Sequence, residues 1–380
     1  MTQQELVGVH RGLSGVVMHA SKITSVDGEE GVLLHHGYNI HDLAKHSTFE
    51  ELAYLLLSGE LPTQSELDSF SSALKANRKI PKEVIDIIYI LKNRHPVDVL
   101  RTAVSALPIP DTRERSDVSL EAITEEGIRL ISQMPIIVAY HQNMREGRDP
   151  IPPSNSLGHA ANFLYMMNGK EPPRDAARLM DADLIVHVDH DINASSLTAR
   201  VTAGTKANLY EAVTGAIGTL AGPAHGGAAE DVMKMVEEIG KPGNAAAYIQ
   251  DMLDGKRRVT GFGHRVYKTR DPRAHHLEES VQKLSQETGN EILYAILKEV
   301  RENMEPLQQK GIYPNVDFFA GVAYSLMGFP TDMFISIFAV GRAPGWIAQY
   351  IEQIKENILI RPLSHYVGLP ERPYIPISRR

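Results

Sequence analysis

Apolar residues recur three to four positions apart along most of this chain, and that spacing is typical of α-helices packed on a core. The clearest examples are residues 84–91, 120–131, 160–167, 176–188 and 230–239. Proline pairs at 152–153 and 172–173 separate such segments and indicate loops. Ser47 and Thr63 each stand three residues before a Glu, which is the spacing of a capping box at a helix start. The sequence therefore predicts a mostly α fold.

Strand signals are confined to the N-terminal part of the chain. Residues 15–23 and 31–36 flank Val26-Asp27-Gly28, and we expect one small β-hairpin there. Composition changes near Gly222, where Gly, Ala and His gather, and again after Pro314, where the chain becomes strongly apolar. These changes predict a smaller helical domain over residues 223–327. Residues 1–222 and 328–380 would form the larger helical domain.

Charge and cysteine content exclude several classes of protein. The chain of 380 residues has 39 Lys and Arg against 47 Asp and Glu, a formal charge of −8, so nucleic acid and anionic membranes are not expected partners. The absence of Cys excludes disulfides, thiolate metal sites and a cysteine nucleophile. No leader or apolar run of ~20 residues is present, and we expect a cytoplasmic protein. The 16 His draw attention to imidazole chemistry.

Several common catalytic motifs are absent from the sequence. G-x-x-x-x-G-K-[ST], G-x-S-x-G and H-E-x-x-H do not occur, so phosphate-loop, serine-hydrolase and zincin functions lose their support. Residues 261–264, Gly-Phe-Gly-His, begin like a dinucleotide-binding loop but lack its third Gly and its preceding strand. A Rossmann-type function is therefore not favoured.

The segment GPAHGG at 222–227 offers a first candidate residue, His225. Glycines allow a ligand to approach the backbone, and an imidazole beside a helix N-terminus is favoured in its neutral form. A neutral imidazole can donate a hydrogen bond to a carbonyl oxygen, as an enol or enolate intermediate requires. The alternative is a structural His in a Gly-rich turn.

The segment GFGHRVYKTRDPR at 261–273 contains a second candidate, His264, among many cations. Arg273, Lys268 and the basic trio at 256–258 supply positive charge suited to carboxylate or phosphate. Taken one at a time, most of these side chains fit a solvated basic loop equally well. Their concentration in an acidic protein favours an anion site.

The segment PNVDFF at 314–319 contains Asp317, the candidate base. Asn315 resembles an N-cap, and Asp317 falls in the first turn of a predicted apolar helix, where a carboxylate ordinarily complements the helix dipole. The functional alternative is a general base whose neighbouring aromatic rings limit its solvation and raise its proton affinity.

Three further segments contain chemically interesting residues. His187, His190 and Asp191 are rich in metal-ligand atoms and could belong to a metal-dependent hydrolase, although no third nitrogen ligand with suitable spacing is evident. Arg342 follows the apolar stretch 334–340 and could simply complement a helix C-terminus. Arg361 precedes a proline and could be a surface residue.

Together these motifs resemble the citrate synthase family in order and approximate spacing. The resemblance also includes HVDHD, GRAPGW and RPLSHYVG and the segment GYNIHDLAKHSTFEELAYLLLSGELP, and so covers nearly the whole chain. It implies a mostly α citrate synthase-like homodimer of the short bacterial or archaeal type, with a large and a small domain closing over the substrates. The implied substrates are oxaloacetate and acetyl-CoA. No permanently bound cofactor or metal is implied, and coenzyme A enters as part of the acyl-CoA substrate.

The resemblance also implies a role for individual residues. Asp317 would remove a proton from the acetyl methyl group, His225 would stabilise the resulting enolate, and His264 would polarise the oxaloacetate carbonyl. The residues implied in oxaloacetate binding are His190, Arg273, Arg342 and, from the partner subunit, Arg361. Those implied in coenzyme A binding are Lys256, Gly261, Phe262, Gly263 and Lys268.

Three alternatives remain open from the sequence. A 2-methylcitrate synthase performs the same chemistry on propionyl-CoA, and one methylene is worth only ~1–3 kcal/mol of discrimination in a pocket. A hydrolase would use the metal-ligand residues His187, His190 and Asp191. A binding protein of the same fold would hold oxaloacetate without catalysis.

Overall fold

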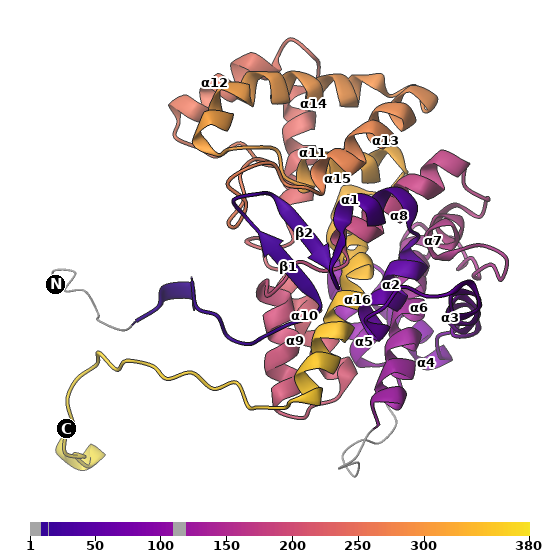
Figure 1. The fold of residues 1–380 in the computed structure, drawn as a ribbon. Coiled ribbons are helices and arrows are strands. Elements are labelled where there is room, and N and C mark those ends of the chain that lie inside the picture. Colours follow the sequence, from indigo (N-terminus) through magenta and orange to yellow (C-terminus); the bar gives the residue numbers. More distant parts are fainter. Residues whose placement is uncertain (1–8, 14, 109–118) are drawn as a thin grey trace.

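The computed structural model describes residues 9–13, 15–108 and 119–380 and is mostly helical (Figure 1). These residues contain sixteen α-helices and one three-stranded antiparallel sheet. The prediction of a mostly α fold with a small N-terminal hairpin is therefore confirmed. Within the described ranges, no helix is both long enough and apolar enough to cross a membrane.

The sheet is short and lies near the N-terminus. Its strands are β1 (Thr24–Asp27), β2 (Val32–His35) and β3 (Tyr38–Asn39). β1 pairs antiparallel with β2, with Thr24 opposite His35, and β2 pairs with β3. Leu33 is fully buried, so the hairpin is anchored on the helical core.

The predicted position of the first strand was wrong, and the third strand was not anticipated. We expected a strand over 15–23 and a turn at Val26-Asp27-Gly28, whereas the strand begins at Thr24 and includes Val26 and Asp27. The earlier residues bond to a helix side chain instead, since the Lys22 N–H donates to Glu352 Oε1 at 2.8 Å. The turn begins after Asp27, whose carboxylate accepts the N–H of Glu30 at 2.9 Å.

Ten helices follow the sheet. They are α1 (Ile40–His46), α2 (Phe49–Ser58), α3 (Gln64–Ala76), α4 (Lys82–Ile90), α5 (Pro96–Ser105), α6 (Leu120–Arg145), α7 (His159–Asn168), α8 (Arg174–His187), α9 (Ala194–Gly204) and α10 (Leu209–Leu220). The capping box predicted at Thr63 is confirmed. The one predicted at Ser47 was displaced by one residue: Ser47 ends α1, and Thr48 accepts the N–H of Glu51 to begin α2.

The helix α16 (Phe334–Lys355) is the buried centre of this group (Figure 1). It packs against α2, α6, α8, α9 and α10, and Trp346 on it is fully buried. At Gly345, α16 lies so close to the end of α8 that only glycine fits. A Cβ added there would lie 2.1 Å from the carbonyl oxygen of Val188. This contact brings α16 against the His187–His190 segment.

Five helices of the predicted smaller domain gather together, at the top of Figure 1. They are α11 (Ala228–Ile239), α12 (Ala245–Asp254), α13 (Ala274–Glu287), α14 (Glu291–Met304) and α15 (Asp317–Leu326). α15 packs on α11 and α13, and α12 packs on α14. The stripe of Phe318, Val322 and Leu326 on α15 is buried, as the four-residue spacing predicts. α13 also contacts α1 and α8, which belong to the other group.

Short 3₁₀ helices and one extended segment complete the chain. The 3₁₀ helices are η1 (Arg11–Leu13), η2 (Glu305–Lys310), η3 (Thr331–Met333) and η4 (Ile377–Arg379). Beyond α16 the chain extends away from the helical body (Figure 1). Apolar side chains on this C-terminal segment are exposed, including Leu363 at 87% and Ile377 at 80%.

Candidate active site

Asp317 is the first residue of α15. Its N–H donates to the side-chain oxygen of Asn315 at 3.1 Å, so Asn315 contributes to the helix start although Val316 occupies the cap position. Burial raises the pKa of the Asp317 carboxyl, while the nearby His187 and Arg273 oppose that shift. A carboxylate with raised proton affinity is suited to accept a proton from a weak acid.

The loop that precedes His264 is tied to the segment that precedes Asp317. Asn315 N–H donates to the Gly261 carbonyl at 2.9 Å, and the Asn315 side-chain amide donates to the Gly263 carbonyl at 3.0 Å. Gly261 has a φ of +82°, and a Cβ there would lie 2.9 Å from Phe318. These hydrogen bonds fix the backbone before His264 relative to the backbone before Asp317.

His264 is held in one tautomer by its own loop. Its Nδ1 accepts the backbone N–H groups of Val266 and Tyr267, both at 3.1 Å. Because Nδ1 accepts both of these hydrogen bonds, the proton of the neutral ring lies on Nε2. Burial, and then Arg273, lower the pKa of His264 to about 4. The ring therefore offers an Nε2–H donor near neutral pH.

His190 is buried directly beside this ring. The two ring centroids lie 5.2 Å apart in an edge-to-face arrangement, and His190 Nε2 lies 3.0 Å from the Tyr267 hydroxyl. Burial, and then the charge of Arg273, lower the pKa of His190 well below its usual value. A second neutral imidazole therefore faces the same region.

His225 is oriented by the first turn of α9. The Ser195 N–H donates to His225 Nε2 at 3.3 Å, and the Ser195 hydroxyl lies 2.9 Å from the same nitrogen. The Trp346 indole donates to that hydroxyl at 3.1 Å. The Ser195 N–H and hydroxyl also donate to Asn193 Oδ1, at 3.2 and 2.8 Å. Because the Ser195 N–H is directed at Nε2 as well, we assign the proton of the neutral ring to Nδ1. Burial, and then Arg342, lower the pKa of His225 to about 4.

Arg342 lies inside α16, so the interpretation of this residue as a C-terminal complement was wrong. Its side chain is only 2% exposed, Nε donates to the His187 carbonyl at 2.5 Å, and the guanidinium lies 4.8 Å from the Phe338 ring centroid. Burial lowers the pKa of Arg342 to about 10, which leaves it charged at neutral pH. Such a buried cation is suited to an anionic ligand.

Arg273 is also buried, and it already has a carboxylate partner. Its Nε and Nη2 donate to Asp271 at 2.9 and 2.7 Å. Asp271 also accepts the N–H of Val316, one residue before Asp317. Asp271 was not anticipated as this partner, although the Asp-Pro-Arg sequence places both residues just before α13.

Six of the seven predicted catalytic and substrate-binding residues lie in one region. Arg342 lowers the pKa values of His225 and His190, and Arg273 lowers the pKa of His264. Both guanidinium groups also favour ionisation of Asp317. The contacts agree for part of this set: the rings of His190 and His264 meet edge to face, and the Asn315–Gly263 hydrogen bond joins the segments of Asp317 and His264.

Arg361 lies apart from these six residues, exposed on the C-terminal segment. The predicted coenzyme A residues fall into two groups. Gly261, Phe262 and Gly263 form the loop tied to Asn315, and Phe262 packs edge-on against the Phe318 ring. Lys256 and Lys268 have exposed side chains.

The residues of the metal-hydrolase hypothesis are not gathered around a common point. His187 Nδ1 lies 2.9 Å from the Asp183 carbonyl, and His190 Nε2 faces Tyr267. Across the described ranges, the group whose ligand atoms lie close enough to hold a metal consists of other residues: His41, His275 and His276.

Sequence reasoning missed the residues that orient the imidazoles. Ser195 holds His225 from 30 positions earlier in the chain, and Trp346 holds Ser195 from 151 positions later. Tyr267 was quoted only as part of a basic loop, yet it contacts both His190 and His264. The one available signal was Asn193, an N-cap residue that identifies the turn containing Ser195.

This helical fold gathers one carboxylate of raised pKa, neutral imidazoles and two buried guanidinium groups, a set typical of an acid–base enzyme for an anionic carbonyl compound. The family model described as "Citrate synthase, C-terminal domain" matches residues 12–363. The chain therefore belongs to the citrate synthase family, whose members are condensing transferases.

Relatives of known name agree with this assignment. A citrate synthase of Synechocystis is 41% identical over 100% of this chain and 96% of its own length. A 2-methylcitrate synthase of Corynebacterium glutamicum is 40% identical over 98% of each chain. The solved citrate synthase of Thermoplasma acidophilum, in a ternary complex with carboxymethyl coenzyme A and oxaloacetate, has a TM-score of 0.90 and 32% identity, covering 97% of this chain and 99% of its own. None of these comparisons supports a hydrolase.

Proposed function

We propose that this enzyme is a citrate synthase that condenses acetyl-CoA with oxaloacetate and then hydrolyses citryl-CoA to citrate and coenzyme A. The observation that carries the proposal is the orientation of two imidazoles: the backbone N–H of Ser195 directs His225 to donate through Nδ1, and two backbone N–H groups direct His264 to donate through Nε2. Two neutral donors serve two carbonyl oxygens, one on each substrate. Asp317 supplies the base between them.

The chemistry then follows in two steps. Asp317 removes a proton from the acetyl methyl group while His225 donates a hydrogen bond to the thioester oxygen, on which negative charge develops. The methylene carbon attacks the keto carbon of oxaloacetate while His264 donates a hydrogen bond to the keto oxygen, and that oxygen takes up the proton carried by Asp317, directly or through solvent, giving citryl-CoA. Water then cleaves the thioester to citrate and the free thiol. Each proton removed is returned to an oxygen or to solvent.

We assign oxaloacetate binding to His190, Arg273 and Arg342. Within the described residues Arg342 donates a hydrogen bond through Nε, which leaves its Nη groups for a ligand. Arg273 has less to offer, because Asp271 occupies two of its donor nitrogens. Two carboxylates held by two buried guanidinium groups would fix the keto carbon for attack.

We assign coenzyme A binding to the loop 261–263 and to the cations Lys256 and Lys268. The two lysines are exposed and suited to phosphate groups, and the Gly-rich loop leaves backbone accessible beside the Phe262 ring. Both features are consistent with an extended, anionic ligand lying across the start of α15.

We also propose that residues 223–327 move as a smaller domain against the rest of the chain. The packing among α11 to α15 supports this division, and these helices lie together at the top of Figure 1. Asp317, His264 and Arg273 lie in this segment, whereas His190 and Arg342 lie outside it. Closure would therefore complete the site and exclude water during condensation.

Without cysteine, the chain lacks the disulfides of many secreted domains, and we place it in the cytoplasm.

We further propose a homodimer in which Arg361 binds oxaloacetate in the partner's site. Its exposed C-terminal segment and the exposed apolar residues around it support this arrangement.

Mixing Asp317→Asn chains with Arg361→Ala chains would then create one intact site in each mixed dimer. We expect about a quarter of wild-type activity after random exchange. Activity no greater than the sum of the two unmixed variants would contradict a role across the dimer.

The substrate is tested by thiol release with oxaloacetate and either acetyl-CoA or propionyl-CoA. We expect kcat/KM to be higher for acetyl-CoA by about 10- to 200-fold, the usual worth of one methylene in a fitted pocket. The 40% identity to a 2-methylcitrate synthase makes the reverse order a specific alternative. A higher value for propionyl-CoA would establish 2-methylcitrate synthase activity. No thiol release with either substrate would reject both.

A further inference from the structure

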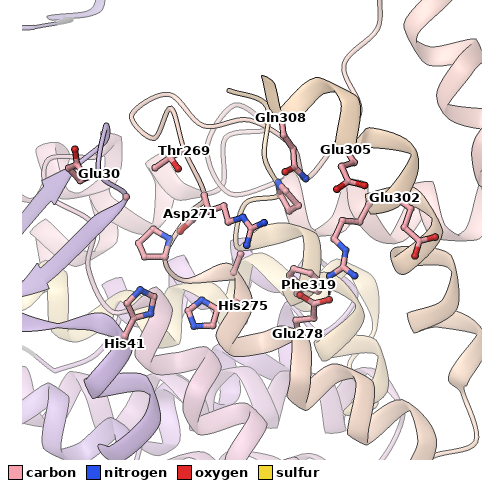
Figure 2. Close-up of a pocket in the computed structure, with 16 residues that line it drawn as sticks. Glu30, His41, Thr269, Asp271, His275, Glu278, Glu302, Glu305, Gln308 and Phe319 are labelled. Atoms are coloured by element: carbon pink, nitrogen blue, oxygen red, sulfur yellow. Dashed lines mark hydrogen bonds and ion pairs between the residues drawn. The ribbon is translucent and has the colours of Figure 1, made fainter. Parts of the chain in front are cut away.

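Three imidazoles from two distant segments meet beside a cavity. His41 lies on α1, and His275 and His276 lie in the first turn of α13. His41 Nδ1 is 2.9 Å from His276 Nε2, and one ring nitrogen from each of the three lies within 4.8 Å of the others. Figure 2 shows the rings of His41 and His275 side by side at the edge of the cavity.

We propose that His41, His275 and His276 bind a divalent transition metal, with Zn²⁺ as the best-fitting ion. Imidazole suits this class of metal, and three nitrogens plus one open position make a familiar zinc geometry. Tetrahedral Zn–N bonds of about 2.0–2.1 Å place two ligand nitrogens about 3.3 Å apart. The 2.9 Å separation of one pair and the 4.8 Å limit for all three lie on either side of that value, so side-chain rotations would bring the nitrogens to metal-binding distance. In the close His41–His276 pair one nitrogen carries the hydrogen-bonding proton, and metal binding would require that ring to take its other neutral tautomer.

The open position of the metal would face the cavity. This cavity has a volume of about 580 Å³, and both His41 and His275 line it. Glu278 follows His275 by three residues, but its carboxylate already accepts from Arg301 and from the Tyr294 hydroxyl. Water from the cavity is therefore the expected fourth ligand. The cavity lining contains more acidic than basic side chains, a balance that favours entry of a cation. The acidic residues are Glu30, Asp271, Glu278, Glu302 and Glu305, and the basic ones are Arg270 and Arg301.

Metal at this site would connect the two groups of helices. His41 belongs to the proposed larger domain and His275 to the proposed smaller one. Arg273 is the cap residue of α13, two positions before His275. A bound ion would therefore restrain both the movement of α13 against α1 and the position of Arg273. This consequence rests on the proposed function and its domain closure, whereas the metal site itself does not.

Equilibrium dialysis of the chelator-treated, full-length protein against Zn²⁺ tests the site without any substrate. We expect one ion per chain, and binding at least about 10²-fold weaker in His41→Ala and His275→Ala, because each change removes a direct ligand. His46→Ala removes an exposed imidazole from the same helix as His41 and should bind like wild type. Undiminished binding in His275→Ala, or equal loss in His46→Ala, would overturn the proposal.

Thiol-release assays on the same variants test the coupling. We expect stoichiometric Zn²⁺ to slow turnover of wild type and of His46→Ala, and to leave His275→Ala unaffected. Zinc-loaded wild type that turns over as fast as the metal-free protein would refute the restraint on α13. Inactivity of the metal-free protein would instead refute the proposed function, and the dialysis result would stand independently.

Discussion

Replacing Asp317 with Asn should lower kcat by about 10³-fold, within the 10²- to 10⁴-fold range of general-base catalysis. The amide keeps the size and the hydrogen-bonding position of the carboxyl group but cannot accept a proton from the acetyl methyl group. Binding of oxaloacetate should persist, because the buried guanidinium groups remain. Stopped-flow thiol release gives kcat, and isothermal titration with oxaloacetate gives the binding constant.

The same substitution should not lower the free energy of unfolding. Burial raises the pKa of Asp317 above its ordinary value of 3.8, so the ionised group costs stability in the folded state. That cost develops as the pH rises from about 3.8 through the folded-state pKa, and it is present in full at higher pH. A neutral Asn removes it. Urea unfolding at neutral pH should therefore show equal or greater stability.

Asp98→Asn is the matched control, because Asp98 is also an acidic residue in the first turn of a helix, α5. If Asp317 only complements its helix dipole, the two substitutions should have similar small effects on stability and none on kcat. Equal kcat values for Asp317→Asn and wild type would therefore reject Asp317 as the base.

The helices were predictable because their signal is local. Thr63 with Glu66 begins α3 as expected, since a capping box depends on four consecutive residues. The first strand was misplaced because Ser21 and Lys22 bond to Glu352, 331 and 330 positions away. Such long-range competition leaves no trace in local periodicity.

The site shows the same division between local and long-range information. The motifs pointed to six residues that the fold brings into one region, yet they could not reveal what fixes each ring. The tautomer of His225 depends on Ser195, and that of His264 on backbone N–H groups that any residue except proline would supply. Arg342 was taken as a possible helix end because the apolar run stops before it, whereas α16 continues to Lys355. The histidine trio escaped notice because His41 and His276 are 235 positions apart.

Replacing His225 with Ala should lower kcat by about 10²- to 10³-fold, the usual cost of one donor to a developing oxyanion. The loss should appear already at proton removal, measured as deuterium exchange into the acetyl methyl group of acetyl-CoA. Ser195→Ala keeps the imidazole and the backbone donor to Nε2, so its loss should be about 10-fold or less, one hydrogen bond's worth. A loss in Ser195→Ala as large as that in His225→Ala would indicate a structural role for this region instead.

The double variant Asp317→Asn with His225→Ala distinguishes cooperation from independent contributions. A carboxylate can deprotonate a thioester methyl group only while the oxygen charge is stabilised, so each residue is effective only in the presence of the other. We therefore expect the double variant to be little slower than Asp317→Asn alone, a strongly non-additive result. If kcat of the double variant instead falls by the product of the two single losses, about 10⁵-fold or more, the two residues act in separate steps. Asp317 and His225 would then not share one proton transfer.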